Sequence, residues 1–287
     1  SPSKFLMQPI KQICEVNGID CQNISPLSGG DINDTYKITT SEKAYAIKLN
    51  QAKRFPNMFE IEAKSLDLLS KTKSFVIPKV IAFGDFENFT YLIIEFIESQ
   101  SGQNFSENFA QALAKMHQNQ SDNFGLDFDN YIGRLEQKNL PQTQNPVDFY
   151  IDLRLEPQFK MAREIGYEFK NLDVFYKNLE SIIPQEKASL IHGDLWAGNY
   201  LITPNNKACI FDPAIAYAPR EMDLAMMKLF GGYPPEIFKL YDELFPLPNE
   251  WESRIDLWQL YYILVHLNLF GSSYLGQAQQ IVKQLSV

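Results

Sequence analysis

The pattern of hydrophobic and polar positions divides the chain into a strand-rich first part and a helix-rich remainder. A helical pattern over 5–17 is followed by strand-like runs at 24–38, 44–49, 80–86 and 91–97. The first run is broken by a Gly-Gly turn, so these runs amount to five strands. Because short glycine or polar turns join neighbouring strands, we predict a five-stranded antiparallel sheet.

Helical spacing becomes dominant after the last of these strands. Phe59, Ala63 and Leu66 already predict one helix before the fourth strand, and the pattern over 105–117 predicts another, ending near His117. Further helices are predicted over 147–162, 220–230, 235–245, 251–270 and 272–285, with a loop-rich stretch over 123–157 and a hairpin turn at 204–207. The polar segment 99–104 has the composition of a linker. We therefore predict an α+β, bilobed fold with a small antiparallel-sheet N-lobe (1–98) and a mainly helical C-lobe (99–287).

Composition and charge narrow the class of protein. The chain has 287 residues, of which 45% are hydrophobic, and a net charge of −9. This acidic balance disfavours a nucleic-acid or anionic-membrane partner, since such surfaces need clustered Lys and Arg. The most apolar run, 257–270, is interrupted by polar residues and is shorter than the roughly 20 residues of a membrane span. Three cysteines without CxxC pairing and the absence of an apolar signal segment lead us to expect a cytoplasmic protein with reduced thiols.

The stretch 190–202 carries the candidate chemistry. Asp194 follows an apolar run, Asn199 stands five residues later, and Asp212 follows the next hairpin. Any one of them alone is more simply a polar residue in a turn, but the ordered set has the spacing of the protein-kinase catalytic and metal-binding loops. Asp194 would orient an attacking hydroxyl and accept its proton, while Asn199 and Asp212 would hold Mg²⁺ on the phosphates of ATP. The sequence thus predicts phosphoryl transfer and a protein-kinase-like fold. His117 is interpreted as a packed core histidine near this loop.

The N-lobe offers candidate nucleotide-binding residues around a glycine turn. Gly29, Gly30, Asp31, Ile32 and Asn33 follow the first strand, and glycines let backbone amides approach a phosphate. Taken alone, the turn is equally consistent with an ordinary hairpin. It lacks the Gly-Lys-Ser/Thr of a P-loop, which is therefore disfavoured.

Lys48 lies on a strand in the apolar-apolar-Lys pattern of the kinase lysine that contacts the α and β phosphates. A strand lysine is more often solvated, so its assignment depends on an acidic partner. We predict Glu62, which lies beside the apolar stripe of the following helix, with Glu60 as the alternative. The strand end Glu95, Phe96 and Ile97 is where a kinase hinge offers backbone groups to adenine.

Two features favour a small-molecule acceptor over a peptide. The interval between Asp212 and Arg220 is too short for an activation loop, and Trp196 stands two residues after Asp194, where protein kinases often have a lysine. The face of Trp196 could stack on a sugar ring or a small cation, or the ring could equally be a core aromatic that anchors the loop.

These motifs resemble the fructosamine kinase (ketosamine-3-kinase) family within the aminoglycoside-phosphotransferase-like kinases. The strongest matches are 192–199, 211–214, 220–226 and 229–232, with support from 28–33, 58–62, 130–133 and 154–158. Leu195-Trp196 is the most discriminating pair, because aminoglycoside, choline and homoserine kinases share the His-Gly-Asp and the Asn but generally not this continuation. The segments 44–47 and 216–219 match more loosely, which leaves the acceptor open.

The resemblance implies ATP-dependent phosphorylation of the third hydroxyl of a sugar ketosamine, a glycated amine, leading to deglycation. In that role Asp194 is the base, Asn199 and Asp212 hold magnesium, and Trp196 lines the acceptor site. Lys48 with Glu62 would steady the phosphates, while Arg220 and Glu221 would be supporting residues.

Two other functions stay open. One is a kinase for another small hydroxylated acceptor, of the aminoglycoside or choline type. The other is a catalytically silent, nucleotide-binding pseudokinase module, which is disfavoured because Lys48, Asp194, Asn199 and Asp212 are all present.

Overall fold

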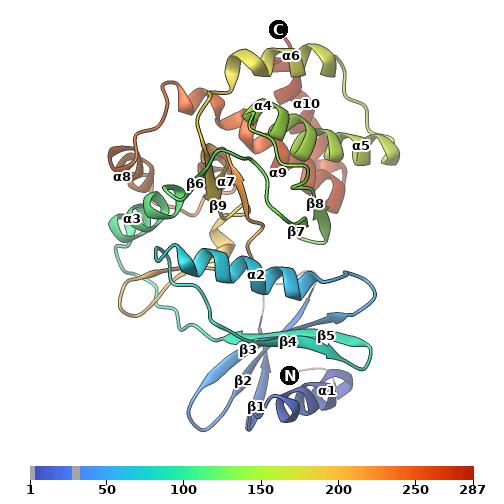
Figure 1. Ribbon diagram of the computed structural model, residues 1–287, viewed down its shortest axis with the longest axis vertical. Coiled ribbons are helices and arrows are strands. Elements are labelled where there is room, and N and C mark those ends of the chain that lie inside the picture. The colour runs from blue at the N-terminus through green and yellow to red at the C-terminus, as the bar shows by residue number, and fades with distance from the viewer. Residues whose placement is uncertain (1–3, 28–32) are drawn as a thin grey trace. The chain divides into compact units, whose positions relative to one another are not determined.

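The computed structural model describes residues 4–27 and 33–287 (Figure 1). The chain forms two compact units. The first comprises residues 1–103 together with 201–211, and the second comprises 104–200 together with 212–287.

The first unit is built on the predicted five-stranded antiparallel sheet, which is confirmed. Its order is β1-β2-β3-β5-β4, and every neighbouring pair is antiparallel. The strands are β1 (Asn23–Pro26), β2 (Asp34–Thr39), β3 (Ala44–Gln51), β4 (Val80–Phe86) and β5 (Phe89–Glu95). β3 lies in the middle of the sheet and is buried over most of its length.

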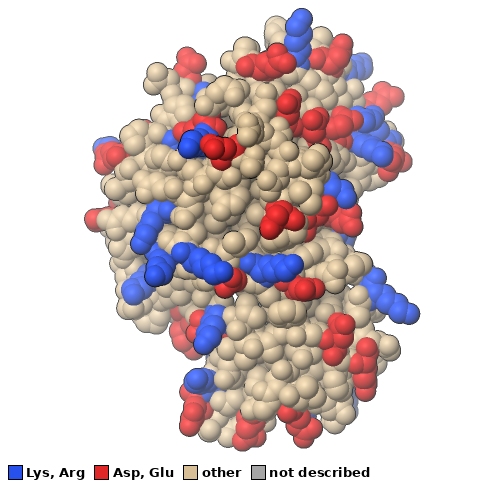
Figure 2. Space-filling view, in the orientation of Figure 1, with Lys and Arg blue, Asp and Glu red and all other residues tan. Residues whose placement is uncertain are grey.

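Two helices pack on this sheet, α1 (Lys4–Val16) and α2 (Met58–Lys71). Ile47 and Leu49 of β3 join a core with the buried residues of α1. Because side chains alternate along a strand, Lys48 points to the opposite face, where Glu62 of α2 meets it. On the face shown in Figure 2, Lys and Arg side chains follow the line of α2, although the whole chain is acidic.

The predicted hairpin around 204–207 is formed by β10 (Tyr200–Ile202) and β11 (Ala208–Ile210). Val76 pairs with Cys209, and its amide donates to the Ala208 carbonyl at 2.9 Å. These contacts attach residues 201–211 to the first unit.

The second unit is mainly helical, as predicted, with α3 (Ser106–His117) preceding the loop-rich stretch. α7 (Glu221–Leu229), α8 (Glu236–Leu244), α9 (Ile255–Phe270) and α10 (Leu275–Gln284) lie close to their predicted positions. The single helix predicted over 147–162 is instead α4 (Pro146–Tyr150), a π-helical segment (Ile151–Leu155) and α5 (Glu156–Ile165), and α6 (Leu172–Ile182) was not predicted. α9 is buried on all sides and forms the centre of the core, with Trp258 and Leu264 fully enclosed. No helix in the described ranges is both long and apolar enough to span a membrane.

Short strands in the second unit position the loop over 192–199, which carries the candidate base and is named the catalytic loop for that reason. β9 (Ala188–Ile191) pairs on one side with β12 (Ala216–Ala218) and on the other with β6 (Gln120–Ser121), and β7 (Asn130–Ile132) pairs with β8 (Leu135–Gln137). Because β9 and β12 are neighbours, the loop after β9 and the segment before β12 lie together. Asp194 follows β9 and Asp212 precedes β12.

Candidate active site

The catalytic loop after β9 is tied to the segment that follows Asp212. The Ala214 amide donates to the His192 carbonyl at 2.9 Å. Gly193 has a φ of +89°, and a Cβ there would lie 1.9 Å from the Ala214 carbonyl oxygen. Glycine is therefore required at position 193 both by the backbone conformation and by the close approach.

Asp223 of α7 holds the same loop from within the core. Its Oδ2 accepts from the His192 amide at 2.9 Å and contacts Nε2 of His117 at 2.8 Å, and its Oδ1 accepts from the Gly193 amide at 3.0 Å. Burial alone would raise the pKa of Asp223, but His117, His192 and the Gly193 amide outweigh it and lower that pKa. His117 is fully buried and also bonds to Tyr241, which confirms it as a packed core histidine.

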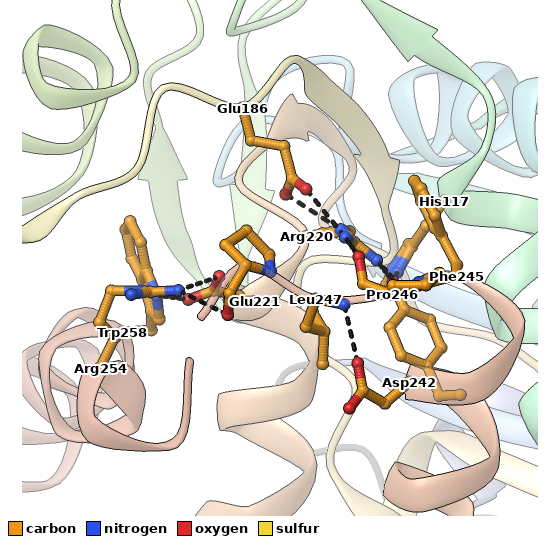
Figure 3. Close-up of polar contacts among 12 residues, drawn as sticks. His117, Glu186, Arg220, Glu221, Asp242, Phe245, Pro246, Leu247, Arg254 and Trp258 are labelled. Carbon is orange, nitrogen blue, oxygen red and sulfur yellow. Dashed lines mark hydrogen bonds and ion pairs between the residues drawn. The ribbon is translucent and has the colours of Figure 1, made fainter. Parts of the chain in front are cut away.

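Arg220 and Glu221 support α7 and its surroundings (Figure 3). Arg220 donates to both carboxylate oxygens of Glu186, at 3.0 and 2.8 Å. Glu221 accepts from Arg254 at 2.8 and 2.9 Å and from the indole nitrogen of Trp258 at 3.0 Å. Both residues are bound to protein groups, as expected of supporting residues.

Asp194 is less well supplied with donors than Asp223. The Asn199 side-chain nitrogen donates to the Asp194 carbonyl at 2.8 Å and approaches its carboxylate at 3.4 Å. Burial, followed by the charges of Asp212 and Asp223, raises the pKa of Asp194 well above its ordinary value, and the Asn199 contact opposes this. A partly buried carboxylate of raised pKa is a stronger base than a solvated one.

The residues around Asp194 suit a hard divalent cation. Asn199 uses its side-chain nitrogen in both contacts with Asp194, which directs its oxygen elsewhere. Asp212 has a φ of +50°, an unusual conformation for a residue other than glycine. Its negative charge contributes to the raised pKa of Asp194. Carboxylate and amide oxygens are the ligands that Mg²⁺ takes in proteins, so the donor set fits this ion.

Trp196 is an exposed ring rather than a core anchor. Its side chain is 40% exposed and lies across Gly198, where a Cβ would come within 2.1 Å of the indole. The Tyr233 hydroxyl donates to the Leu195 carbonyl at 3.1 Å and fixes the backbone beneath the ring. An exposed aromatic side chain thus stands two residues after Asp194.

The first unit contains the predicted ion pair. Lys48 Nζ lies 2.7 Å from Glu62 Oε2, with both side chains largely buried, whereas Glu60 is exposed. The pairing with Glu62 is therefore confirmed. The pair joins β3 to α2 and holds an ammonium group on the face of the sheet away from α1.

The other predicted nucleotide-binding residues fall into two groups. Gly29, Gly30, Asp31 and Ile32 lie outside the described residues, while Asn33 accepts from the Asn50 side chain at 2.7 Å. At the end of β5, the amides of Glu95 and Phe96 donate to the carbonyls of Lys79 and Ala44, at 2.9 and 3.2 Å. An adenine would therefore have to be recognised by other backbone groups of this segment, such as those of Ile97.

The contacts of Asp223 with the catalytic loop were not predicted from the sequence. A signal was present, because α7 carries Glu221 and Asp223 within an otherwise apolar run and both are buried. Buried carboxylates need donors, so charged residues spread around a buried helix indicate a polar network in the core.

Comparisons with known proteins show the family of the chain. A model of the fructosamine kinase family matches residues 6–287. A protein of Enterococcus faecium named "probable ketoamine kinase" is 37% identical over 286 residues, covering 96% of this chain and 99% of that protein. A protein of the same name from Vibrio parahaemolyticus is 36% identical over 264 residues, covering 90% of this chain and 91% of that protein.

Solved structures show the same fold. A protein of Haemophilus somnus, provisionally named a fructosamine-3-kinase, superposes with a TM-score of 0.87 at 28% identity, covering 96% of each chain. A spectinomycin phosphotransferase solved with ADP and spectinomycin gives a TM-score of 0.62 at 19% identity, covering 97% of this chain and 91% of that one. These likenesses confirm the predicted protein-kinase-like fold. Because the family model matches residues 6–287 of the chain, the chain belongs to the fructosamine kinase family.

Proposed function

We propose that this protein is an ATP- and Mg²⁺-dependent kinase that phosphorylates a sugar hydroxyl of ketosamines, such as fructosamines or ribulosamines. The observation that carries the proposal is the arrangement around Asp194, a carboxylate of raised pKa that Asn199 contacts and that Asp212 influences, in a chain of this family. The names of the relatives support a ketoamine acceptor, and one of them names position 3 of the sugar. Deglycation would be the consequence of phosphorylating that hydroxyl.

In this proposal Asp194 acts as the general base. It would accept a hydrogen bond from the acceptor hydroxyl, orient its oxygen toward the γ-phosphorus of ATP and take its proton as the new bond forms. A positioned base contributes about 100- to 10,000-fold to such a rate. Asp223 fixes the backbone of the loop, and Asn199, at 3.4 Å, is a weak donor to the Asp194 carboxylate and lowers its basicity only in part.

Asn199 and Asp212 would hold Mg²⁺ through oxygen atoms. When bound, the ion supplies positive charge that neutralises the phosphates. Its charge would also favour the ionised form of Asp194, which counteracts the effect of burial.

The nucleotide would be held by residues of the first unit. Glu62 keeps the Lys48 ammonium in one position, from which it would contact the α and β phosphates. The backbone of 29–33 would cover the phosphates, and the segment 95–97 would bind adenine. Magnesium binding, these contacts and a cytoplasmic location are all part of the proposal.

Trp196 would line the acceptor site. Its exposed face is suited to the apolar face of a sugar ring or to the ammonium of a ketosamine. Such a site would bind a small sugar amine by stacking, whereas a peptide substrate would need an extended binding surface.

The test is ATP consumption with a fructosyl amine, a ribulosyl amine, an aminoglycoside and choline, each measured for wild type and Asp194→Asn. We expect turnover with the ketosamines and a loss of about 100- to 10,000-fold in the variant. Asp127→Asn, which removes an exposed carboxylate of the same unit, is the matched control and should keep wild-type turnover.

The result also separates the alternatives. Turnover confined to the aminoglycoside or choline would replace the ketosamine by another hydroxylated acceptor. Nucleotide binding without any turnover would identify a pseudokinase module, and full activity in Asp194→Asn would refute the assigned base.

A further inference from the structure

A buried polar cluster in the second unit has no role in the steps described so far. Its members are Asn130 on β7, Gln137 on β8, Asn139 just beyond, Arg154 in the π-helical segment and Tyr261 on α9. None of them is more than 3% exposed. Burying a guanidinium and three amides is unfavourable unless their hydrogen bonds are made. The partners of these hydrogen bonds therefore indicate what the cluster holds in place.

One branch of the cluster begins at Arg154. Its guanidinium donates to the carbonyls of Lys138 and Leu153 and, at 2.8 Å, to Oδ1 of Asn139. The Asn139 nitrogen donates to Oδ1 of Asn130 at 2.9 Å, and the Asn130 nitrogen donates to the Ile215 carbonyl at 2.8 Å.

The direction of this chain of donors is fixed by chemistry. A guanidinium has donors only, so Asn139 must turn its oxygen toward Arg154 and its nitrogen toward Asn130. Asn130 must then receive on its oxygen and donate with its nitrogen. Reversing either amide would place two donors or two acceptors face to face.

A second branch begins at Tyr261 and ends at the Ala214 carbonyl, one residue before the end of the first branch at Ile215. The Tyr261 hydroxyl donates to Oε1 of Gln137 at 2.8 Å, and the Gln137 nitrogen donates to Asn130 Oδ1 at 2.9 Å and to the Ala214 carbonyl at 3.0 Å. Asn130 thus joins the two branches.

Both branches end on the segment that follows Asp212. Their acceptors are the carbonyls of Ala214 and Ile215, two and three residues beyond it. The same segment also contacts the catalytic loop, because the Ala214 amide donates to His192 and the Ala214 carbonyl lies against Gly193. Contacts to the cluster and to the loop therefore fix the orientations of these peptide planes, next to a residue held at positive φ.

We propose that Asn130, Gln137, Asn139, Arg154 and Tyr261 are positioning residues for the Asp212 carboxylate. By fixing the peptide planes at 214 and 215, they hold Asp212 in the conformation that binds the metal–nucleotide complex. This inference rests on the proposed function, in which Asp212 is a magnesium ligand.

The test uses variants at the junction and at one end of the cluster. Asn130→Ala removes the donor to Ile215 and the acceptor of Gln137 and Asn139, while Tyr261→Phe removes one hydroxyl and keeps the ring. Gln158→Ala is the matched control, because Gln158 is a buried amide of the same unit whose partner is Asn268. Any general effect of losing a buried amide should appear in this control.

Three measurements separate positioning from simple loss of stability. Mn²⁺ binding in the presence of ADP, followed by electron paramagnetic resonance, reports the metal site without turnover. Hydrogen exchange of the amides at 212–218 reports the loop, and activity gives the half-saturating Mg²⁺ concentration and the acceptor KM.

For Asn130→Ala we expect Mn²⁺ and Mg²⁺ to bind roughly 10- to 100-fold more weakly, as is usual when a residue that supports a metal ligand is removed. Exchange at 212–218 should become faster, and the acceptor KM should stay near the wild-type value. Tyr261→Phe should show the same pattern with a change of roughly two- to tenfold, the weight of one hydrogen bond. Since Tyr261→Phe keeps the packing, it decides the question if Asn130→Ala does not fold.

Metal affinity and exchange in Tyr261→Phe that match those of Gln158→Ala would overturn the inference. A wild-type protein that binds Mn²⁺ and ADP but phosphorylates no ketosamine would instead refute the proposed function. The metal-binding and exchange measurements would still decide the inference in that case.

Discussion

Asp194 and Asp223 are two carboxylates of the same unit with opposite environments. Asp223 accepts from two backbone amides and from His117, and its pKa is lowered, whereas Asp194 has one weak contact from Asn199 and a raised pKa. Asp223 is itself one of the charges that raise the pKa of Asp194. Two carboxylates whose environments drive their pKa values apart have different tasks, so Asp223 serves the structure and Asp194 is available for chemistry.

The difference also shows how the fold keeps Asp194 basic. The catalytic loop needs polar anchors, but donors placed on the Asp194 carboxylate would lower its pKa. The chain instead anchors the loop through the backbone of His192 and Gly193, which bond to Asp223. Three variants test this division, in order of decreasing effect.

The largest effect is expected for Asp223→Ala. It leaves two buried amides and His117 without their acceptor, and breaking a buried charged cluster in this way costs about 3–5 kcal/mol of stability. Because the pKa of Asp223 is lowered in the folded protein, its contribution is present above its unfolded value of about 3.9 and is lost as the pH falls through the folded value.

Urea unfolding at pH 7 and at acid pH measures both effects. The difference between wild type and Asp223→Ala should be large at pH 7 and should narrow toward acid pH. Equal unfolding midpoints at pH 7 would show that the loop does not depend on Asp223.

A smaller effect is expected for His117→Phe. The variant keeps an aromatic ring but loses the bonds to Asp223 and Tyr241, and hydrogen bonds to a charged group contribute about 1.5–3 kcal/mol. The loss should be smaller than for Asp223→Ala, because the two backbone amides still bind Asp223.

His266→Phe is the matched control for this variant in the same urea experiment. The His266 ring is only partly buried, and Nδ1 contacts a single carbonyl, that of Tyr262. A larger loss of stability in His266→Phe than in His117→Phe would contradict the conclusion that the bonds of His117 to Asp223 and Tyr241 stabilise the fold.

How much of this site can be predicted from the sequence depends on how far apart in the chain the interacting residues lie. The sheet, the pairing of Lys48 with Glu62 and the order of Asp194, Asn199 and Asp212 were predictable, because alternation, helical spacing and short motifs are local signals. The Glu62 assignment needed only its place beside an apolar stripe.

The networks behind the site were not predictable, because their members are far apart in the chain. His117 and Asp223 are separated by 106 residues, and Asn130 and Ile215 by 85. The π-helical segment around Arg154 was also missed, since its apolar spacing reads as one continuous helix. Tertiary hydrogen bonds, rather than local propensity, decide both features.

The smallest effect is expected for the stability of Asp194→Asn. Because folding raises the pKa of Asp194, the folded state binds the proton more tightly than the unfolded state, and wild-type stability falls as the pH rises from about 3.9 toward the folded value. Asparagine carries no charge, so the variant should avoid this loss. We expect it to be more stable than wild type by about 0.5–2 kcal/mol at pH 7, a usual gain when an active-site strain is removed, and equally stable near pH 3.5.

Thermal unfolding from pH 3.5 to 8, without nucleotide and with EDTA, measures this difference, and Asp127→Asn shows the effect of removing an exposed carboxylate. Parallel stability curves for wild type and Asp194→Asn would mean that Asp194 ionises as easily in the folded protein as in the unfolded chain. A difference in stability that grows as the pH rises would mean that the ionised form of Asp194 destabilises the folded protein. Mg²⁺ and ATP should then narrow the difference, because positive charge beside Asp194 stabilises its ionised form.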